Sequence, residues 1–479
     1  MKRGRRFADD EWLKRPKRPS INTLFSTDNG VAPGKRALRG ADRLHEGTPT
    51  SDIAEKKQLW QIWDNLAFAR SFHSFRMAIS PARMIIALGM VLLICLIGWF
   101  MDLVTAPIHP AAEEAPAAVT FSNAELRILS RDSSMAFAQI ERYRQSQRFR
   151  GVFSTLWHFG AARFNAATIA LFRLEIADML VNIWMCGLAI VWAARFHPIY
   201  SAVYFVLVAM VTAVCGGAIC RTAALEFARG EKPGLVEGLR YGIRKFRSLL
   251  SAPLVLGGIT ACFAACVVVT GLIGNIPYGG EIFISLALGV ALVFGLVTLL
   301  FLIGSVAGAG LVFPAIAYEG SDGHDAISRS FCYVYTRPWW MFFYTALAAA
   351  FGTVSYLFVR VFTYGVLVLT YVLLDLGVAN EADGPGKLAR IWGKPDFFTL
   401  ITPNAGPANV TESIAAFLIY ATMLLVVGVV VAFVISFYFC SSTIIYALMR
   451  RKVDQVDMGR VYTALEHVAG PAHVEGGTD

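Results

Sequence analysis

Seven long apolar runs constrain this chain more than any other feature of its sequence. They cover residues 84–104, 177–194, 199–222, 251–273, 282–317, 340–374 and 414–448. About 20 apolar residues in a helix cross the roughly 30 Å of hydrocarbon in a bilayer. A closed β-barrel would instead need alternating segments of about ten residues, which the sequence lacks. The sequence therefore predicts an all-α, polytopic integral membrane helical bundle with six to seven transmembrane helices.

Charge is scarce and unevenly distributed. Only 16% of the 479 residues are charged, against about 25% in soluble domains. Residues 1–83 hold 17 Lys and Arg against 9 Asp and Glu, and account for most of the net charge of +9. Basic segments next to membrane helices favour the cytoplasmic side and attract anionic lipid. We expect the N-terminal segment to lie in the cytoplasm, to contact membrane lipids, and to bind no specific nucleic acid.

Composition divides the chain into six predicted segments. The first is too poor in large apolar residues to fold, and the second places aromatic residues at helical spacing beside Lys and Arg. The segments are a disordered basic cytoplasmic tail (1–55), an amphipathic interfacial helix (56–83), the first transmembrane helix (84–104), a polar, partly helical extramembrane region (105–176), a helical membrane domain (177–448) and a cytoplasmic C-terminal tail (449–479).

Topology conflicts with the simple count of runs. The segments that follow 199–222 and 414–448 are basic, so both should face the cytoplasm. A cytoplasmic N-terminus then requires an even number of crossings before Arg221, whereas the runs provide three. We interpret 177–194, the shortest run, as re-entrant or interfacial. The alternative keeps it as a crossing and places the N-terminal tail or residues 105–176 on the other side.

A short repeat follows three of the apolar runs. Each copy is a polar turn, "ARGEKPG", "EGSDGHD" or "RRKVDQVDMG", followed by three apolar residues at i, i+4 and i+7 spacing, which is one face of a helix. The triplets are Leu239, Ile243 and Phe246, then Ile327, Phe331 and Val334, then Val461, Leu465 and Val468. The repeat predicts cytoplasmic amphipathic interface helices that lie on the membrane and join helical hairpins.

The middle turn gathers Asp322, His324 and Asp325 within four residues. Asp322 and Asp325 have the spacing of a helix N-cap and its acidic partner. The other two turns have no His at the place of His324, and a metal site needs at least three convergent ligands. We interpret the cluster as a helix cap. We therefore expect no catalytic, cofactor-binding or metal-ligating residue, and no cofactor.

Arg360 interrupts the run 340–374. An ionisable residue inside a membrane marks a functional site by default. Arg360 nevertheless lies 20 residues beyond Trp340, or about 30 Å along a helix, so we favour a side chain that snorkels to the opposite interface.

Glycines spaced four residues apart indicate close helix contacts. They are Gly234, Gly238 and Gly242, and Gly304 and Gly308; the adjacent pair Gly216 and Gly217 indicates a close contact as well.

The stretch "FPAIAYEGSDGHDAISRSF" with "RPWWMFF" resembles uncharacterised multi-pass bacterial membrane proteins. It is also similar to the polytopic membrane domain that accompanies some glycerophosphodiester phosphodiesterases. The resemblance covers about residues 200–450 and implies a bacterial inner membrane (cytoplasmic membrane) location. No soluble phosphodiesterase domain is present in this chain, so that activity is not carried over.

Motifs of nucleotide hydrolysis, zinc proteolysis and serine hydrolysis are absent from the sequence. We expect a non-enzymatic protein of scaffold, accessory or membrane-organising type, whose partners are membrane lipids and other membrane proteins or a second copy of itself. The alternative is a permease or lipid-handling transporter with a cavity between repeated helical hairpins.

Overall fold

The structure, a computed structural model, describes residues 73–105, 151–277, 279–378, 386–402, 404–456 and 458–462, together with 137, 138, 140, 141 and 144. Every regular element among them is an α-helix. Seven of the helices are long and apolar enough to cross a membrane, which confirms the predicted all-α polytopic bundle. The predicted tail 1–55 and most of the predicted interfacial helix lie outside the described residues.

Twelve helices follow one another in the described part of the chain. They are α2 (His73–Ala78), α3 (Pro81–Thr105), α6 (Val152–Phe172), α7 (Ile176–Phe196), α8 (Pro198–Arg229), α9 (Leu235–Arg244), α10 (Phe246–Ile273), α11 (Gly280–Glu319), α12 (Gly323–Thr336), α13 (Pro338–Gly377), α14 (Lys387–Ile391) and α15 (Val410–Val453).

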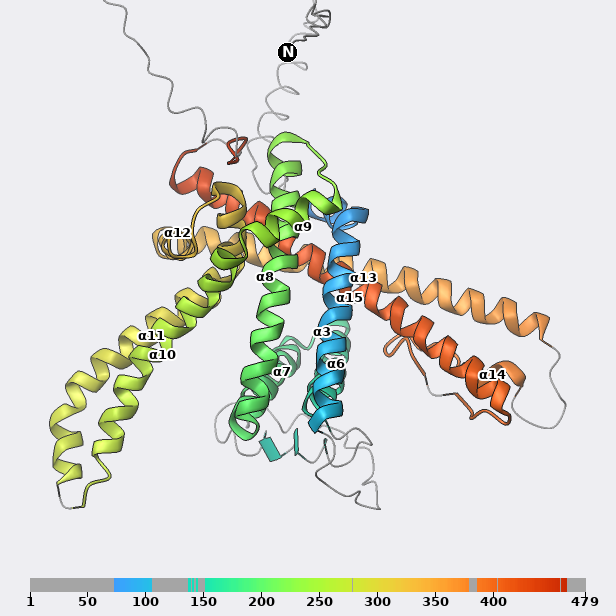
Figure 1. Cartoon of the computed structure of the whole chain (residues 1–479), viewed down its shortest axis with the longest axis horizontal. Coiled ribbons are helices and arrows are strands. Elements are labelled where there is room, and N and C mark those ends of the chain that lie inside the picture. Colours follow the sequence, from blue (N-terminus) through green and yellow to red (C-terminus); the bar gives the residue numbers. More distant parts are fainter. Residues whose placement is uncertain are drawn as a thin grey trace, which may run out of the picture. The chain divides into compact units, whose positions relative to one another are not determined.

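The ends of α8, α11 and α15 meet the beginnings of α3, α10 and α13 at one end of the bundle (Figure 1). Arg83 of α3 is paired with Glu226 of α8, and Lys245, just before α10, bonds to the carbonyl of Gly320 after α11. Lys452 of α15 lies over the ring of Trp340 in α13. We call this end of the bundle the elbow end.

The main buried core lies at the elbow end. Much of it consists of small side chains on facing helices, including Ala218 and Ala224 of α8, Ala315 and Ala317 of α11, and Ala447 of α15. Small residues let helix backbones approach closely, which is how membrane helices gain packing energy without a hydrophobic drive from water. The predicted close contact at Gly216 and Gly217 is confirmed, because an added Cβ would press on Phe439 and Leu249.

Two long hairpins extend from this core. The helices α10 and α11 run side by side, and so do α13 and α15 (Figure 1). Both α11 and α13 have 40 residues, and α15 has 44. At 1.5 Å per residue these helices are about 60 Å long or more, twice the roughly 30 Å of hydrocarbon. In a bilayer they must therefore tilt or continue beyond the hydrocarbon.

A third hairpin, of α6 and α7, bears on the conflict over topology. Asp102, near the end of α3, accepts hydrogen bonds from the amide of Phe153 at the start of α6 (3.0 Å) and from the hydroxyl of Tyr200 at the start of α8 (2.8 Å). The hairpin thus begins and ends at one point, opposite the elbow end. A hairpin of this kind returns the chain to the side it left, which agrees with an even number of crossings before Arg221 if α3 and α8 each cross the membrane once.

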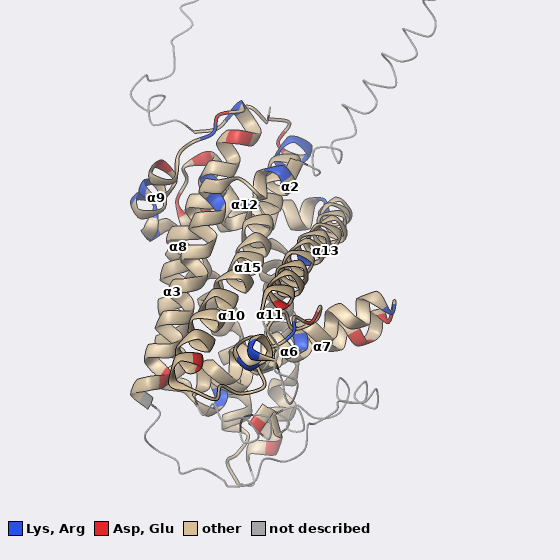
Figure 2. Ribbon diagram, turned by 90° about the vertical axis from the view of Figure 1, so that its right-hand side faces the viewer, with Lys and Arg blue, Asp and Glu red and all other residues tan. Residues whose placement is uncertain are grey.

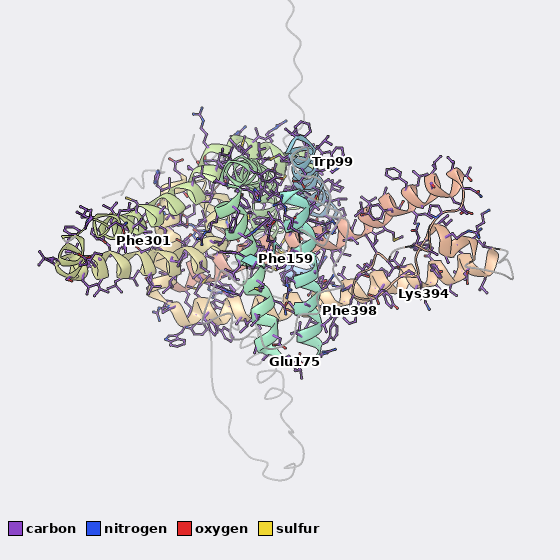
Figure 3. All side chains as sticks on the ribbon, turned by 90° about the horizontal axis from the view of Figure 1, so that it is seen from below. Trp99, Phe159, Glu175, Phe301, Lys394 and Phe398 are labelled. Carbon is purple, nitrogen blue, oxygen red and sulfur yellow. The ribbon has the colours of Figure 1, made fainter. Side chains whose placement is uncertain are left out.

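The run 177–194 is therefore not a lone segment but half of a helix pair. Its partner α6 lies within residues 105–176, which we predicted to be a polar, partly helical extramembrane region, and α6 is such a helical part. Polar residues such as His158 and Arg163 interrupt α6, and this masks its apolar character in the sequence. Seen from below, the pair runs from the level of Phe159 to the turn at Glu175 (Figure 3).

The predicted interface helices are only partly as expected. As predicted, α9 and α12 directly follow turns, and these begin at Gly230 and Gly320, whose positive φ angles of 71° and 63° favour glycine. However, Ile327 and Val334 of α12 are buried in the protein core, so this helix does not simply lie on the membrane. Of the third triplet only Val461 is described, in a segment that is not helical.

The predicted interfacial helix 56–83 is interrupted within its described part. The helix α2 ends at Ala78 and α3 begins at Pro81, three residues before the predicted Met84. Met77 and Ala78 are buried, and the hydroxyl of Ser436 in α15 donates to the carbonyl of Ala78 at 2.8 Å. Residues 73–78 are thus part of the packed bundle.

Candidate functional site at the elbow end

Charged and hydroxyl side chains from three helices form a cluster around Glu319, the last residue of α11. We call it the elbow cluster; its members are Glu319, Arg329, Tyr333, Tyr446, Arg450 and Asp454. One carboxylate oxygen of Glu319 lies 2.8 Å from Nε of Arg329. The other lies 3.3 Å from Nε of Arg450 and accepts a hydrogen bond of 2.6 Å from Tyr446. One carboxylate therefore joins α11, α12 and α15.

A second interaction closes the cluster. The hydroxyl of Tyr333 in α12 donates to the carboxylate of Asp454, just after α15. A tyrosine hydroxyl is protonated at neutral pH, and burial and this hydrogen bond raise the pKa of Tyr333 further, so the hydroxyl remains a donor. The rings of Tyr333 and Tyr446 lie 5.6 Å apart between their centroids. Charges and aromatic packing thus fix the same three helices.

The segment 460–462 is bound across the elbow end by arginines. Arg450 donates to the carbonyl of Arg460 at 2.6 Å, Arg229 to that of Val461 at 3.1 Å, and Arg221 to that of Tyr462 at 2.8 Å. The amide of Tyr462 in turn donates to the carbonyl of Tyr318 at 2.8 Å. Three residues that have no regular structure are therefore held by α8, α11 and α15.

A buried ion pair joins the first membrane helix to this end. Arg83 is 1% exposed, and its guanidinium lies 2.5 Å from the carboxylate of Glu226. Its Nε donates to the carbonyl of Met77 at 2.6 Å. Lys and Arg residues gather at this end of the bundle, near α2 and α9 (Figure 2).

The residues singled out in the sequence lie beside the elbow cluster rather than at its centre. Asp322 occupies the N-cap position of α12, but its side chain makes no capping hydrogen bond. Asp325 pairs with Arg329 at 3.1 Å, and His324 is exposed. Within the described residues no group of three or more His, Cys, Asp and Glu side chains is placed to hold a metal ion.

The prediction that Arg360 snorkels to an interface is wrong. Arg360 is only 3% exposed. Its guanidinium donates to the carbonyls of Phe397, at 3.0 Å, and Phe398, and to the side chains of Asn165, at 3.1 Å, and Tyr356. The connection between α13 and α15 therefore folds back and covers Arg360; Phe398 and Lys394 on this connection are seen in Figure 3.

Replacement of Arg360 by Met should release the connection between α13 and α15. Hydrogen bonds from a charged group contribute about 1.5–3 kcal/mol each, so amide hydrogen exchange in residues 396–402 should accelerate by at least about tenfold. Arg360→Lys should also release the connection, because one ammonium group cannot make the several hydrogen bonds of the planar guanidinium. Lys394→Met, an exposed change in the same connection, serves as the control. Unchanged exchange in Arg360→Met would contradict the anchoring role.

Protonation of His197 should weaken the fold in acid. The ring lies between α7 and α8, with Nε2 at 3.2 Å from Nη1 of Arg144. Burial and then the positive charge of Arg144 lower the pKa of His197. The unfolded chain binds a proton at His197 more readily than the folded protein does. The contribution of His197 to the free energy of unfolding is therefore fully present above about pH 6.5 and is lost as the pH falls below that value.

The measurement is the melting temperature of the purified protein between about pH 7 and about pH 5. His197→Gln should reduce the fall in melting temperature over this range. His324→Gln, which changes an exposed histidine, should leave the fall unchanged. Equal falls in His197→Gln and the wild type would refute this role of His197.

The geometry of the elbow cluster is suited to holding helices together. Sequence reasoning missed Glu319, because its partners Tyr446 and Arg450 lie more than 120 residues further along the chain. The acidic residue before the Gly of the "EGSDGHD" turn was the only local signal. In comparisons with known proteins, this chain is matched by no family model, no curated protein and no solved structure.

Proposed function

We propose that this protein is a non-enzymatic integral membrane protein of scaffold or membrane-organising type. The observation that supports it best is the contrast between the elbow end, which is densely packed and ion-paired, and the hairpins, whose apolar surfaces remain open. A fixed core from which long apolar arms extend is suited to positioning other components of a membrane. It is less suited to the alternating movements of a transporter.

The arms offer a large apolar surface. The most apolar 18-residue stretch of α11 has no buried residue, and Leu286 in this helix is 84% exposed. In a bilayer such a surface is covered by lipid or by another membrane protein. Lipid tails are as apolar as leucine, so apolarity alone does not favour lipid or protein as the neighbour of this surface. Shape and packing against the surface determine which of the two binds.

The proposal includes an orientation and a location. Basic residues exceed acidic ones in the elbow-end segments 219–252 and 446–462, and this pattern supports a cytoplasmic elbow end. The resemblance to multi-pass bacterial proteins supports the bacterial cytoplasmic membrane as the location.

Photocrosslinking in the native host tests the organising role. A photoreactive amino acid at Leu286 of α11 should give adducts of discrete mass with other membrane proteins or with a second copy. The same amino acid at Leu311, which is buried in the same helix, is the matched control and should give none. Adducts with lipid alone at Leu286 would argue against a scaffold role.

A second candidate, lipid handling, is favoured by a groove between α13 and α15. The groove has a volume of about 400 Å³ and is mostly apolar, with hydroxyls from Thr345, Thr353, Ser441 and Ser442. These dimensions and this lining suit an acyl chain. The test is movement of a fluorescent phospholipid between leaflets of proteoliposomes. Faster movement than in protein-free vesicles, abolished by Ala349→Trp in the groove, would favour this function over the scaffold.

A further inference from the structure

A cavity of about 340 Å³ lies between α8 and α9 at the elbow end. Its walls include four basic side chains, Arg221, Arg240, Arg244 and Lys245, and one acidic side chain, Glu237. The lining therefore carries an excess of positive charge. A concave site lined mainly by one sign of charge concentrates ions of the opposite sign.

Two of the basic groups are fixed in place by the protein. Arg221 donates to the carbonyls of Ala317 and Tyr462, both at 2.8 Å, and lies 5.0 Å from the ring centroid of Tyr241. Nζ of Lys245 donates to the carbonyl of Gly320. Such groups need little further ordering when a ligand arrives, which lowers the entropic cost of binding.

In the described part of the chain the basic side chains of this cavity make no close ion pair, although Glu237 and Glu231 act on Arg221 from a greater distance. Among the described residues, no Asp or Glu oxygen lies within 4.0 Å of the charged nitrogens of the four basic side chains. Arg83, Arg329 and Arg450, at the same end of the bundle, are each paired with a carboxylate. The positive charges of these four side chains can therefore interact with an anion bound in the cavity.

The face of α9 beside the cavity indicates the kind of anion. Val236 and Ile243 are both 66% exposed, and Arg240 lies between them at helical spacing. Exposed apolar residues beside an exposed arginine allow this part of α9 to contact the membrane surface, where basic side chains meet anionic headgroups. The anions that line a membrane surface carry phosphate, and arginine binds phosphate through paired hydrogen bonds.

We propose that this cavity binds a phosphate-bearing anion, with Arg240 and Arg244 contacting the phosphate and Arg221 and Lys245 as fixed charges at its wall. A phospholipid headgroup and a soluble phosphate share this chemistry. The site goes beyond the proposed scaffold role and does not depend on it. It requires only the contact of α9 with α8.

The test compares two double variants of the full-length protein purified in neutral detergent. The probe is phosphatidylglycerol, and its retention is measured by native mass spectrometry. Arg240→Gln with Arg244→Gln should weaken retention by at least about tenfold, because each removes a charged hydrogen bond. Lys232→Gln with Arg247→Gln removes the same charge from exposed sites outside the cavity and should change retention by less than about twofold. Equal loss in both would overturn the site, because it would indicate diffuse attraction.

Glu237→Gln provides a variant that gains binding and so does not depend on damage to the fold. It removes the acidic side chain from the cavity wall and should strengthen retention of phosphatidylglycerol. Weaker or unchanged retention would count against an anion in this position.

Competition with inorganic phosphate distinguishes a phospholipid headgroup from a soluble phosphate as the ligand of the cavity. Displacement of phosphatidylglycerol by sodium phosphate, but not by sodium chloride at equal ionic strength, identifies a soluble phosphate as a ligand. Retention that sodium phosphate leaves unchanged, but the cavity variant abolishes, identifies the headgroup. Binding of neither probe overturns the proposal while leaving the photocrosslinking test of the scaffold role unaffected.

Discussion

Glu319→Gln is expected to lower the free energy of unfolding by about 2 kcal/mol, since interactions with a charged group contribute about 1.5–3 kcal/mol and the side chains of Glu319 and Arg450 are only 9% and 13% exposed. Here the carboxylate serves two arginines, Arg329 and Arg450. The amide keeps the size of the side chain and an acceptor for Tyr446, so the variant isolates the loss of charge. The measurement is thermal or denaturant unfolding of the purified protein in detergent.

Asp325→Asn is the matched control. It removes one negative charge from the same Arg329, but Asp325 is 48% exposed, and exposed pairs contribute about 1 kcal/mol or less. The double variant Glu319→Gln with Arg450→Met should lower the free energy of unfolding by less than the sum of the two single changes, because the two side chains interact directly. Equal effects of Glu319→Gln and Asp325→Asn would show that the elbow cluster is not the stabilising centre of this end.

Gly242→Ala is expected to destabilise the protein by about 2 kcal/mol through overpacking. A Cβ at Gly242 would lie 2.2 Å from the backbone carbonyl oxygen of Val214 in α8. Backbone cannot rotate away as a side chain can, so α9 must move away from α8. This cost exceeds the gain of about 1 kcal/mol that alanine brings to a helix. Unfolding and hydrogen exchange of α9 are the measurements.

Gly257→Ala in α10 is the control, because no atom lies within 4 Å of the Cβ it would add. It should leave stability unchanged or raise it. The predicted close contact of the glycine ridge is confirmed at Gly238 and Gly242, whereas Gly234 has open space around it. If Gly242→Ala is as stable as the wild type, α9 does not pack against α8 as the structure describes.

The membrane helices were predictable because their signal is local. A run of about 20 apolar residues needs no knowledge of distant segments, and the same holds for the turns at Gly230 and Gly320. The repeat likewise located α9 and α12 correctly. It could not say that Ile327 would be buried while Ile243 stays exposed, because that depends on which helix lies opposite.

The polar contacts were not predictable because they are made between distant segments. The depth of Arg360 along one helix says nothing of three of its four hydrogen-bond partners, which lie in α6 and in the connection after α13. The hydrogen bond from Ser436 in α15 to the carbonyl of Ala78, at the end of α2, likewise joins distant segments. In each case the deciding neighbour is separated in sequence by tens to hundreds of residues.

The position of the segment 460–462 has a consequence for the order in which the protein matures. Chains fold from the N-terminus as they are synthesised, so Asp102 can find Tyr200 while most of the helices are still to be made. The carbonyls that Arg221 and Arg229 bind belong to Tyr462 and Val461, which leave the ribosome after α15, the last of the described membrane helices. The arms can therefore still rearrange during insertion, and the elbow end becomes locked only when synthesis has passed the last of them.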